Sequence, residues 1–410
     1  MSAAQLSVAN YRKGMYLLVE GKNSNGNFFI LREGRVELSK QMQFPEENSM
    51  SMVVPGDFVG IVPAMAKRSQ IESAQALVDS SAIVINRNQF GDLIQNNPQI
   101  AIKVIQQFSR RIRFLNDSLA RFSSSGPAGK KNEDGADRLF HLGEFYRKTS
   151  MNVKAYYVFK RYMECYPDGL NFKEAQAMEV NLNQYSSSGY ENTNTPFQRN
   201  YKDGGLIFAE GEMGRELYII KKGSVKICRI LDGNETILAI LKEGDIFGEM
   251  AVIDDKPRSA TAVALGDACM MAILKENFAA ISETQPQIIT NITRTLSERI
   301  WFSYKQLSNA LIKDPVGRIY NYLAITLEKN NIEQIPGMSY IFSFSAKELM
   351  KMASIPADKY KTMFTEIFRR NGLVSQVDEK LVVNDVDEIY KLGIFYKNRQ
   401  ERETANAAAK

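Results

Sequence analysis

The chain has 410 residues, of which 44% are hydrophobic and 24% charged, with a formal net charge of +5 at pH 7. This length predicts two to four domains, because single hydrophobic cores stop growing well below that size. The mild basic excess does not by itself indicate a polyanionic partner. No apolar run reaches the length of a membrane span and no apolar signal core follows the first residues, so we expect a cytoplasmic protein.

Reactive side chains are scarce in this composition. His141 is the single histidine, and Cys165, Cys228 and Cys269 lie far apart without metal-ligand spacing. These counts argue against a Ser-His-Asp or Cys-His catalytic site and against a zinc site. We therefore expect neither an enzyme nor a bound metal, while carboxylate or lysine chemistry is left open by counting alone.

The first predicted element is a β-roll, because residues 11–38 alternate short apolar runs with glycine turns. The same pattern returns near Tyr201, which predicts two copies of one domain. The aligned pairs are Glu20 with Glu210, Gly21 with Gly211, and Gly34 with Gly223.

A long helix follows each roll. Apolar residues recur at alternating spacings of four and three, which is typical of a heptad seam that packs on another helix. The first seam comprises Ala101, Ile105, Phe108, Ile112, Leu115, Leu119 and Phe122, and the second Ile289, Leu296, Ile300, Ser303, Leu307 and Ala310. The partner is either a second subunit, giving a homodimer, or the equivalent helix of the same chain, giving an intrachain pseudo-dimer.

The segment between the rolls begins with a small, flexible and charged stretch at 123–135, which indicates an exposed linker. Residues 137–169 then match the spacing of a tetratricopeptide helical hairpin at Leu139, Leu142, Gly143, Tyr146, Ala155, Phe159 and Pro167. A single repeat cannot bury its own faces. It is therefore either a spacer packed on a neighbouring domain or a docking surface for a protein partner.

Residues 247–262 carry the chemistry of a phosphate and ribose clamp. Gly248 lets the backbone approach a ligand, Glu249 can accept hydrogen bonds from a ribose hydroxyl, and Arg258 presents a planar fork to phosphate oxygens. Ser259 and the small Ala260 leave room for backbone N–H groups at the same anion.

This stretch resembles the phosphate-binding cassette of the cyclic-AMP receptor protein superfamily, with F-G-E-M-A followed by P-R-S-A-T. The resemblance implies a cyclic mononucleotide ligand, cAMP being favoured and cGMP remaining an alternative. It also implies these ligand-binding residues: Phe247, Gly248, Glu249, Met250, Arg258, Ser259 and Ala260. Ser303 and Tyr304, on the helix expected to cover the base, are predicted to discriminate between bases, and Trp301 or Phe302 to stack on one. Helix packing is the alternative role for all four.

The first copy departs from this pattern. When Gly60 is aligned with Gly248 and Ser73 with Ser259, Ile61 stands in place of Glu249 and Glu72 in place of Arg258. A carboxylate at the phosphate position repels an anion, so the alignment predicts that this roll has lost nucleotide binding. The loop appears two residues longer in this alignment, and Arg68 is left as an alternative phosphate ligand.

The sequence from Asp314 resembles the DNA-binding domain of the same superfamily, a winged helix-turn-helix. Ser345 is expected to cap a helix, Ala353 to lie near the tight turn, Pro356 to start the second helix and Gly372 to end it. Residues 356–370 are then the recognition helix. Ala357, Asp358 and Thr362 occupy positions where relatives often have arginine, which leaves as candidate DNA contacts Lys359, Tyr360, Lys361, Arg369 and Arg370.

Together these patterns predict an α+β multidomain protein: two jelly-roll-like β-rolls with long C-terminal helices, a helical linker and a winged helix-turn-helix. The expected boundaries are 1–126, 127–187, 188–313 and 314–410. The expected function is a cyclic-nucleotide-responsive regulator that binds double-stranded DNA. The alternative is a nucleotide receptor that signals through protein contacts, for example at 137–169, without DNA. Neither role involves a membrane.

Overall fold

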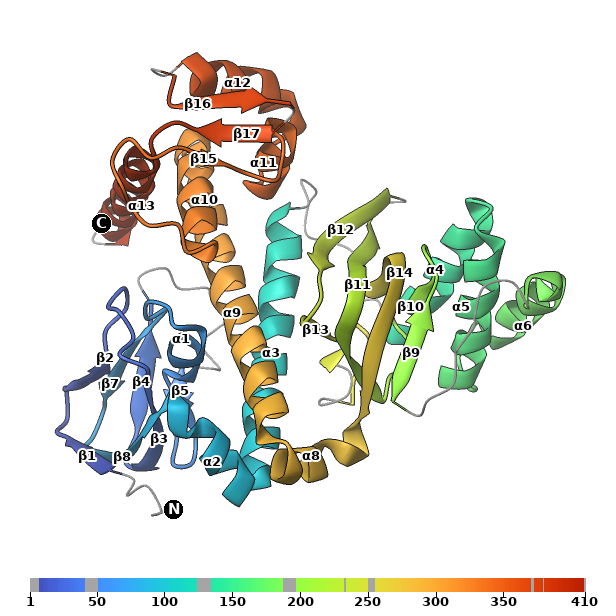
Figure 1. Ribbon diagram of the computed structural model, residues 1–410, viewed down its shortest axis with the longest axis horizontal. Helices are drawn as coiled ribbons and strands as arrows, with labels where there is room; N and C mark the ends of the chain where they lie inside the picture. Colours follow the sequence, from blue (N-terminus) through green and yellow to red (C-terminus); the bar gives the residue numbers. More distant parts are fainter. Residues whose placement is uncertain are drawn as a thin grey trace. The chain divides into compact units, whose positions relative to one another are not determined.

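The computed structural model describes residues 7–40, 51–123, 134–186, 197–231, 234–249, 255–369, 372–378 and 380–408 (Figure 1). The chain divides into two compact units. The first unit comprises 1–89, 114–128 and 296–410, and the second comprises 90–113 and 129–295. Both long helices, α3 (Pro98–Ser123) and α9 (Pro286–Ala310), begin in the second unit and end in the first. None of the described helices is long and apolar enough to cross a membrane.

The described residues of the first roll, 7–40 and 51–97, form two antiparallel four-stranded sheets. One has the order β1 (Ser7–Tyr11), β8 (Ser80–Asn86), β3 (Asn27–Glu33) and β6 (Phe58–Val59), and the other β2 (Tyr16–Leu18), β7 (Ser73–Ala76), β4 (Val36–Ser39) and β5 (Met52–Val53). Side chains alternate between faces, and the inward set, including Phe29, Leu31 and Val36, forms the core between the sheets. The short helix α1 (Ile61–Ala66) lies between β6 and β7.

In the second roll, the residues that the structure describes form a six-stranded antiparallel sheet. The long strands β11 (Glu216–Leu231) and β14 (Thr261–Leu274) pair along most of their length, and β10 (Leu206–Phe208), β12 (Asn234–Leu241), β13 (Ile246–Phe247) and β9 (Gln198–Tyr201) pair beside them. This sheet places the turn after β13 and the segment before β14 close together, and these two stretches carry the candidate site. The predicted mixture of helices and sheets in several domains, two of them built on β-sheets, is confirmed.

The described part of the segment between the rolls, residues 134–186, contains α4 (Gly135–Lys148), α5 (Asn152–Cys165) and α6 (Phe172–Asn181). Asp134 caps α4 by accepting a hydrogen bond from the Asp137 N–H at 2.9 Å. The predicted apolar positions of α4 and α5 share one buried cluster with Leu206 and Val263 of the second roll. The hairpin therefore buries its apolar face on a neighbouring domain, as the spacer alternative requires.

The apolar seams are buried within a single chain. Ala101, Ile105, Phe108, Ile112 and Leu115 of α3 are buried, and Leu119 is partly buried. Ile289, Leu296, Ile300 and Leu307 of α9 are buried as well. In the second unit, α2 (Phe90–Asn96) packs on α8 (Phe278–Thr284), its counterpart from the second copy. The equivalent short helices of the two copies thus meet inside one chain.

The described residues of the C-terminal part form helices and a three-stranded sheet. The helices are α10 (Pro315–Lys329), α11 (Ala346–Met352), α12 (Tyr360–Arg369) and α13 (Val386–Ala408), and the sheet order is β15 (Tyr340–Ile341), β17 (Lys380–Val383) and β16 (Val374–Val377). Ser345 caps α11 through a reciprocal capping box with Glu348, as predicted. Ala353 is the C-cap of α11, and a 3₁₀ turn at Ala357–Lys359 leads into α12.

Within the first unit, the loop after α1 contacts α9 and α10. The Arg68 guanidinium donates to the backbone oxygens of Glu328 and Lys329 at 2.5 and 2.8 Å, and it lies 5.1 Å from the Trp301 ring centroid. The Trp301 indole N–H donates to the Ser69 oxygen at 3.2 Å. The last carbonyls of a helix have no partner inside the helix, so Arg68 satisfies two acceptors at the end of α10.

Replacing Arg68 with Ala should leave these two carbonyls without their charged donor. We expect the free energy of unfolding to fall by about 1–2 kcal/mol, because each hydrogen bond contributes about 0.5–1.5 kcal/mol. Denaturant titration followed by circular dichroism measures the change. Lys22→Ala, at an exposed position of the same roll, is the control and should stay within about 0.5 kcal/mol of the unmodified protein. Equal stability of the two variants would contradict the capping role.

Candidate functional site

The turn after β13 lies over a floor of three aromatic rings. Phe247 and Tyr218 stack with ring centroids 5.3 Å apart, and Phe208 lies 5.8 Å from Phe247. Burial raises the pKa of Tyr218 well above its usual value, and its hydroxyl donates to the Glu216 carboxylate at 2.9 Å. At Gly248 φ is +79°, and a Cβ there would lie 2.6 Å from Arg258 Nη1. Only glycine therefore fits between the turn and the guanidinium.

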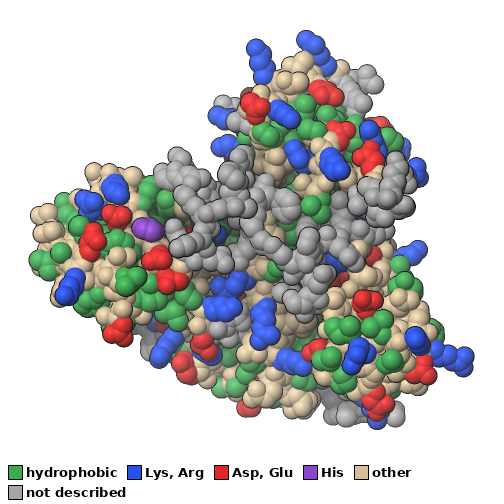
Figure 2. All heavy atoms as spheres, turned by 180° about the vertical axis from the view of Figure 1, so that it is seen from behind, with side chains coloured by type: hydrophobic (Ala, Val, Ile, Leu, Met, Phe, Trp, Pro, Cys, Tyr) green, Lys and Arg blue, Asp and Glu red, His purple; other side chains and the backbone are tan. Residues whose placement is uncertain are grey.

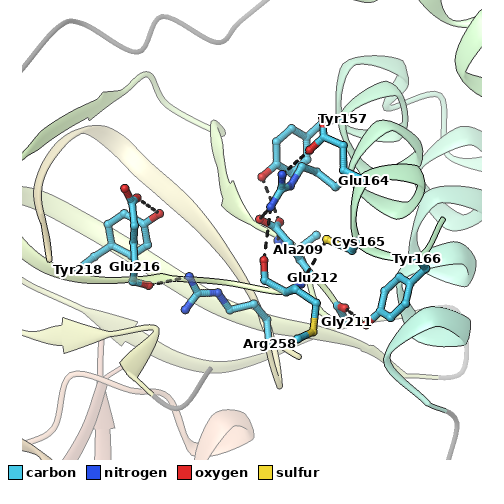
Figure 3. A network of polar contacts seen from close by, with 12 residues as sticks. Tyr157, Glu164, Cys165, Tyr166, Ala209, Gly211, Glu212, Glu216, Tyr218 and Arg258 are labelled. Atoms are coloured by element: carbon cyan, nitrogen blue, oxygen red, sulfur yellow. Dashed lines mark hydrogen bonds and ion pairs between the residues drawn. The ribbon is translucent and has the colours of Figure 1, made fainter. Parts of the chain in front are cut away.

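Arg258 is the main charged group of this site, and its side chain extends toward Glu216 (Figure 3). It is 4% exposed. Its Nη1 and Nη2 donate to the backbone oxygens of Gly248 and Glu216 at 2.5 and 2.7 Å, and the guanidinium carbon lies 4.1 Å from the Phe208 centroid. Nε is buried and has no hydrogen-bond partner among the described residues.

A buried cation with carbonyl acceptors and an unused donor is suited to an anion. Carbonyl dipoles orient the guanidinium but do not neutralise its charge, so a phosphate at Nε would gain both a hydrogen bond and an opposite charge. The residues present therefore fit a phosphate group. Among the residues described, no group of three or more His, Cys, Asp or Glu side chains is placed to hold a metal ion.

The other predicted ligand-binding residues divide into two sets. Glu249 is 1% exposed and Ala260 is also buried, and both belong to the second unit with Phe247, Gly248 and Arg258. Met250 lies outside the described residues. Ser303 and Tyr304 belong to the first unit, where Tyr304 is buried and the Lys40 ammonium lies 3.8 Å from its ring centroid. Trp301 is engaged by Ser69, and Phe302 lies beside Lys329.

The backbone of Arg258 is held by the loop at 209–213, which we call the anchor loop. The Arg258 N–H donates to the Glu212 oxygen at 2.8 Å, and the Gly211 N–H donates to the Arg258 oxygen at 2.9 Å. The Glu210 N–H donates to Thr261 Oγ1 at 3.0 Å. The sequence interpretation used Glu210 and Gly211 only to align the two copies. Because this Glu-Gly pair occurs in both copies, its structural role could have been inferred from the sequence.

The hydrogen bonds of the first roll correct the alignment of its cassette. The Gly21 N–H donates to the Gln70 oxygen at 2.9 Å, the Gln70 N–H to the Lys22 oxygen at 2.8 Å, and the Glu20 N–H to Ser73 Oγ at 3.0 Å. These bonds repeat those of the anchor loop one for one. Gln70 is therefore the counterpart of Arg258, and Glu72 the counterpart of Ala260.

The alignment was wrong by two residues because it matched the Ser-Ala pair at 73 and 74 with the one at 259 and 260. The strand pairings agree with the corrected register, since Leu18 faces Ala74 as Phe208 faces Ala262. The loop of the first cassette is therefore not longer than that of the second. For aligning the two rolls, a match of two residue types is weaker evidence than a shared set of backbone hydrogen bonds. Backbone N–H and C=O groups form these bonds whatever the side chain is.

In the corrected register a neutral side chain stands where the second roll has Arg258. Gln70 is 5% exposed, carries no charge, and its Oε1 has no partner among the described residues. Ile61 is buried where the second roll has Glu249, and the Glu72 carboxylate lies 3.6 Å from Lys40 Nζ. Arg68, the alternative ligand, is engaged by the end of α10.

The exposed face of α12 carries charges of both signs. Lys361 and Arg369 are exposed, as is Lys359 in the 3₁₀ turn before the helix, but so is Glu366, which sequence reasoning did not consider. Lys361, Thr362, Thr365, Glu366 and Arg369 line one open depression. Tyr360 packs against the hydrophobic core of this domain, and Arg370 lies outside the described residues. On the face seen in Figure 2, basic and acidic side chains are interspersed.

Comparison with known proteins identifies the two rolls. The family described as "Cyclic nucleotide-binding domain" matches residues 8–97 and 198–285. The chain thus contains two copies of this domain, and the predicted repeat is confirmed.

Several known proteins are similar to parts of the chain. The cyclic AMP receptor protein of Thermus thermophilus is 38% identical over 25% of this chain and 49% of its own length, so the chain spans about half of that relative. A CRP-like cAMP-activated global transcriptional regulator of Mycobacterium tuberculosis is 23% identical over 45% of this chain and 83% of its own length.

Human cGMP-dependent protein kinase 2 is 21% identical over 66% of this chain and 26% of that protein. Among solved structures, the crystal structure of Thermus thermophilus catabolite activator protein covers 48% of this chain and 90% of its own, with 24% identity and a TM-score of 0.28. The relatives thus include both transcriptional regulators and a kinase.

Proposed function

We propose that this protein is a regulator that binds a cyclic mononucleotide in its second roll and acts on DNA through its C-terminal domain. The observation that carries the first part is Arg258, a buried cation with an unpartnered Nε beside the Gly248 turn. Arg258 and the backbone N–H groups near Ser259 and Ala260 would hold the cyclic phosphate. Glu249 would accept from the ribose hydroxyl.

We propose cAMP as the ligand, with cGMP as the competing one. The names of two relatives refer to cAMP and that of a third to cGMP. Calorimetric titration of the full chain with cAMP, cGMP and cyclic dinucleotides tests this choice. We expect saturable binding of one molecule per chain, since the first roll has Gln70 at the phosphate position. Two equivalent sites, or none, would contradict the proposal.

We further propose that the C-terminal domain is a winged helix-turn-helix. Its support is local: a capped α11, a tight turn at Ala353, α12 with an exposed polar face, and the β16–β17 hairpin after it. This order fits a recognition helix followed by a wing. In this proposal Lys359, Lys361 and Arg369 contact phosphates, while Ala357 and Thr362 cannot form forked contacts with guanine.

This composition of α12 predicts weak, salt-sensitive and modestly selective DNA binding. Replacing Lys359 and Lys361 with Ala should weaken binding to all sequences alike and flatten the salt dependence by up to about two units, because each phosphate contact releases a counterion. Glu366→Gln, which removes the acidic group of the same face, should strengthen binding. Fluorescence anisotropy with duplex DNA at several salt concentrations measures both. Sequence-selective nanomolar binding by the unmodified protein at physiological salt would contradict this prediction.

A second candidate function is a nucleotide receptor that acts through protein contacts, with the helices at 137–169 as the contact surface. The mixed charge of α12 and the similarity to a kinase favour it. An electrophoretic survey of genomic fragments with and without cAMP separates the two candidates. Retarded fragments support the DNA-binding regulator, and retardation of none under any nucleotide condition supports the receptor.

A further inference from the structure

We propose that α4 and α5 act as a positioning element for the nucleotide site, with Glu212 as the residue that connects them to Arg258. This inference rests on the proposed nucleotide binding at Arg258. It adds that the affinity of the second roll depends on helices that precede it in the chain. The connection runs from α5 to the carboxylate of Glu212, and from the backbone of Glu212 to that of Arg258 (Figure 3).

The first step is the carboxylate of Glu212, which is 5% exposed. Its Oε1 accepts from Arg161 Nη2 at 2.8 Å, and its Oε2 accepts from the Tyr157 hydroxyl and the Ala209 N–H, each at 3.0 Å. A buried carboxylate is stable only when its oxygens are paired in this way. Burial lowers the pKa of Arg161 and the Glu212 carboxylate raises it, the net shift being upward. Both side-chain donors come from α5, so α5 holds the anchor loop by a buried charge pair.

The second step is the close packing of the anchor loop against the start of α4. Gly211 has φ of +87°, and a Cβ there would lie 2.3 Å from the Gly135 oxygen. The Tyr166 hydroxyl donates to the Gly211 oxygen at 2.7 Å. A Cβ on Gly135 would lie 2.5 Å from Pro257 Cγ, next to Arg258. The first turn of α4, the anchor loop and the cassette are in direct contact, so we expect a shift of α4 or α5 to displace the backbone of Arg258.

Comparison with the first roll shows which of these contacts occur in the second roll alone. It has the same backbone ladder, but Lys22 replaces Glu212 and is exposed. The ladder is therefore a general feature of the roll. The buried carboxylate belongs to the copy that also carries the phosphate ligand. This pairing favours a role for Glu212 in the function of the site over a role in folding alone.

The test is calorimetric titration of full-length Glu212→Gln with cAMP. We expect the dissociation constant for cAMP to rise by about three- to thirty-fold at unchanged stoichiometry. The substitution weakens the charge-assisted contact with Arg161, and the backbone of residue 212 bonds directly to that of Arg258. Tyr157→Phe removes a single hydrogen bond with little loss of packing, and we expect a rise of about two- to five-fold. Arg161→Lys keeps the charge, so its affinity for cAMP should be closer to that of the unmodified protein than the affinity of Arg161→Ala is.

Glu164→Gln is the matched control. It removes the other carboxylate partner of Arg161, whose side chain is 45% exposed, whereas that of Glu212 is 7% exposed. Its affinity should equal that of the unmodified protein. If Glu212→Gln does not fold, as judged by circular dichroism, Tyr157→Phe and the two Arg161 variants decide the question.

Hydrogen exchange supplies a readout that a purely structural role would not change. Coupling is reciprocal, so saturating cAMP should slow amide exchange in α5 of the unmodified protein and not in Glu212→Gln. If the unmodified protein binds cAMP and Glu212→Gln binds it equally well with equal protection of α5, the positioning role is wrong and the nucleotide site stands. If the unmodified protein binds no cyclic nucleotide, the proposed function fails and this inference fails with it.

Discussion

Replacing Arg258 with Leu is expected to weaken cAMP binding by about thirty- to a thousand-fold. The substitution removes a charge-assisted fork, a loss of roughly 2–4 kcal/mol in binding free energy. Leu retains apolar volume over Phe208, so the aromatic floor should stay packed. Calorimetric titration of the full chain measures the change, and the melting temperature reports whether the fold is kept.

The first roll provides the matched control for this experiment. Gln70→Leu alters the structural counterpart of Arg258, at a similar burial, in the copy without a cationic ligand. We expect its cAMP affinity to equal that of the unmodified protein. Unchanged affinity in Arg258→Leu would remove the basis for placing the phosphate at this residue. A large loss in Gln70→Leu would instead place a nucleotide site in the first roll.

The second large effect is expected at the seam of α3. Ile112 is 1% exposed in the single chain. Ile112→Lys places a charge without a partner in an apolar environment, and we expect a loss of about 3–5 kcal/mol in the free energy of unfolding. The melting temperature should fall. Sedimentation should show an unchanged mass, because the seam is covered within one chain.

Arg110→Glu is the control on the same helix, since Arg110 is exposed. Its stability should stay within about 0.5 kcal/mol of that of the unmodified protein. A dimer that dissociates on Ile112→Lys substitution without loss of monomer stability would show that the seam pairs two chains. A variant with unchanged mass and melting temperature would refute the seam.

Local patterns allowed much of the architecture to be predicted. Alternating apolar residues and glycine turns predicted two rolls, since strand and turn preferences act over a few residues. Ser345 predicted the start of α11, because an N-cap side chain bonds to backbone N–H groups only two or three residues further on. The chemistry of Gly248, Glu249 and Arg258 was also legible in the sequence, because a tight turn and a cationic fork are properties of residue types.

Only the tertiary structure decided how distant segments meet. It placed Gln70 opposite the Gly21 turn, which corrected the register of the first cassette, because a backbone ladder leaves no trace in side-chain identity. It covered the seam of α3 within one chain, whereas a heptad pattern requires an apolar neighbour without specifying which. It also joined Arg161 and Tyr157 to Glu212 across some 50 positions of sequence. The sequence by itself determined which side chains can bind a nucleotide. The packing of α4 and α5 decided which neighbouring residues position those side chains, because burial and long-range pairing arise only once the chain has folded.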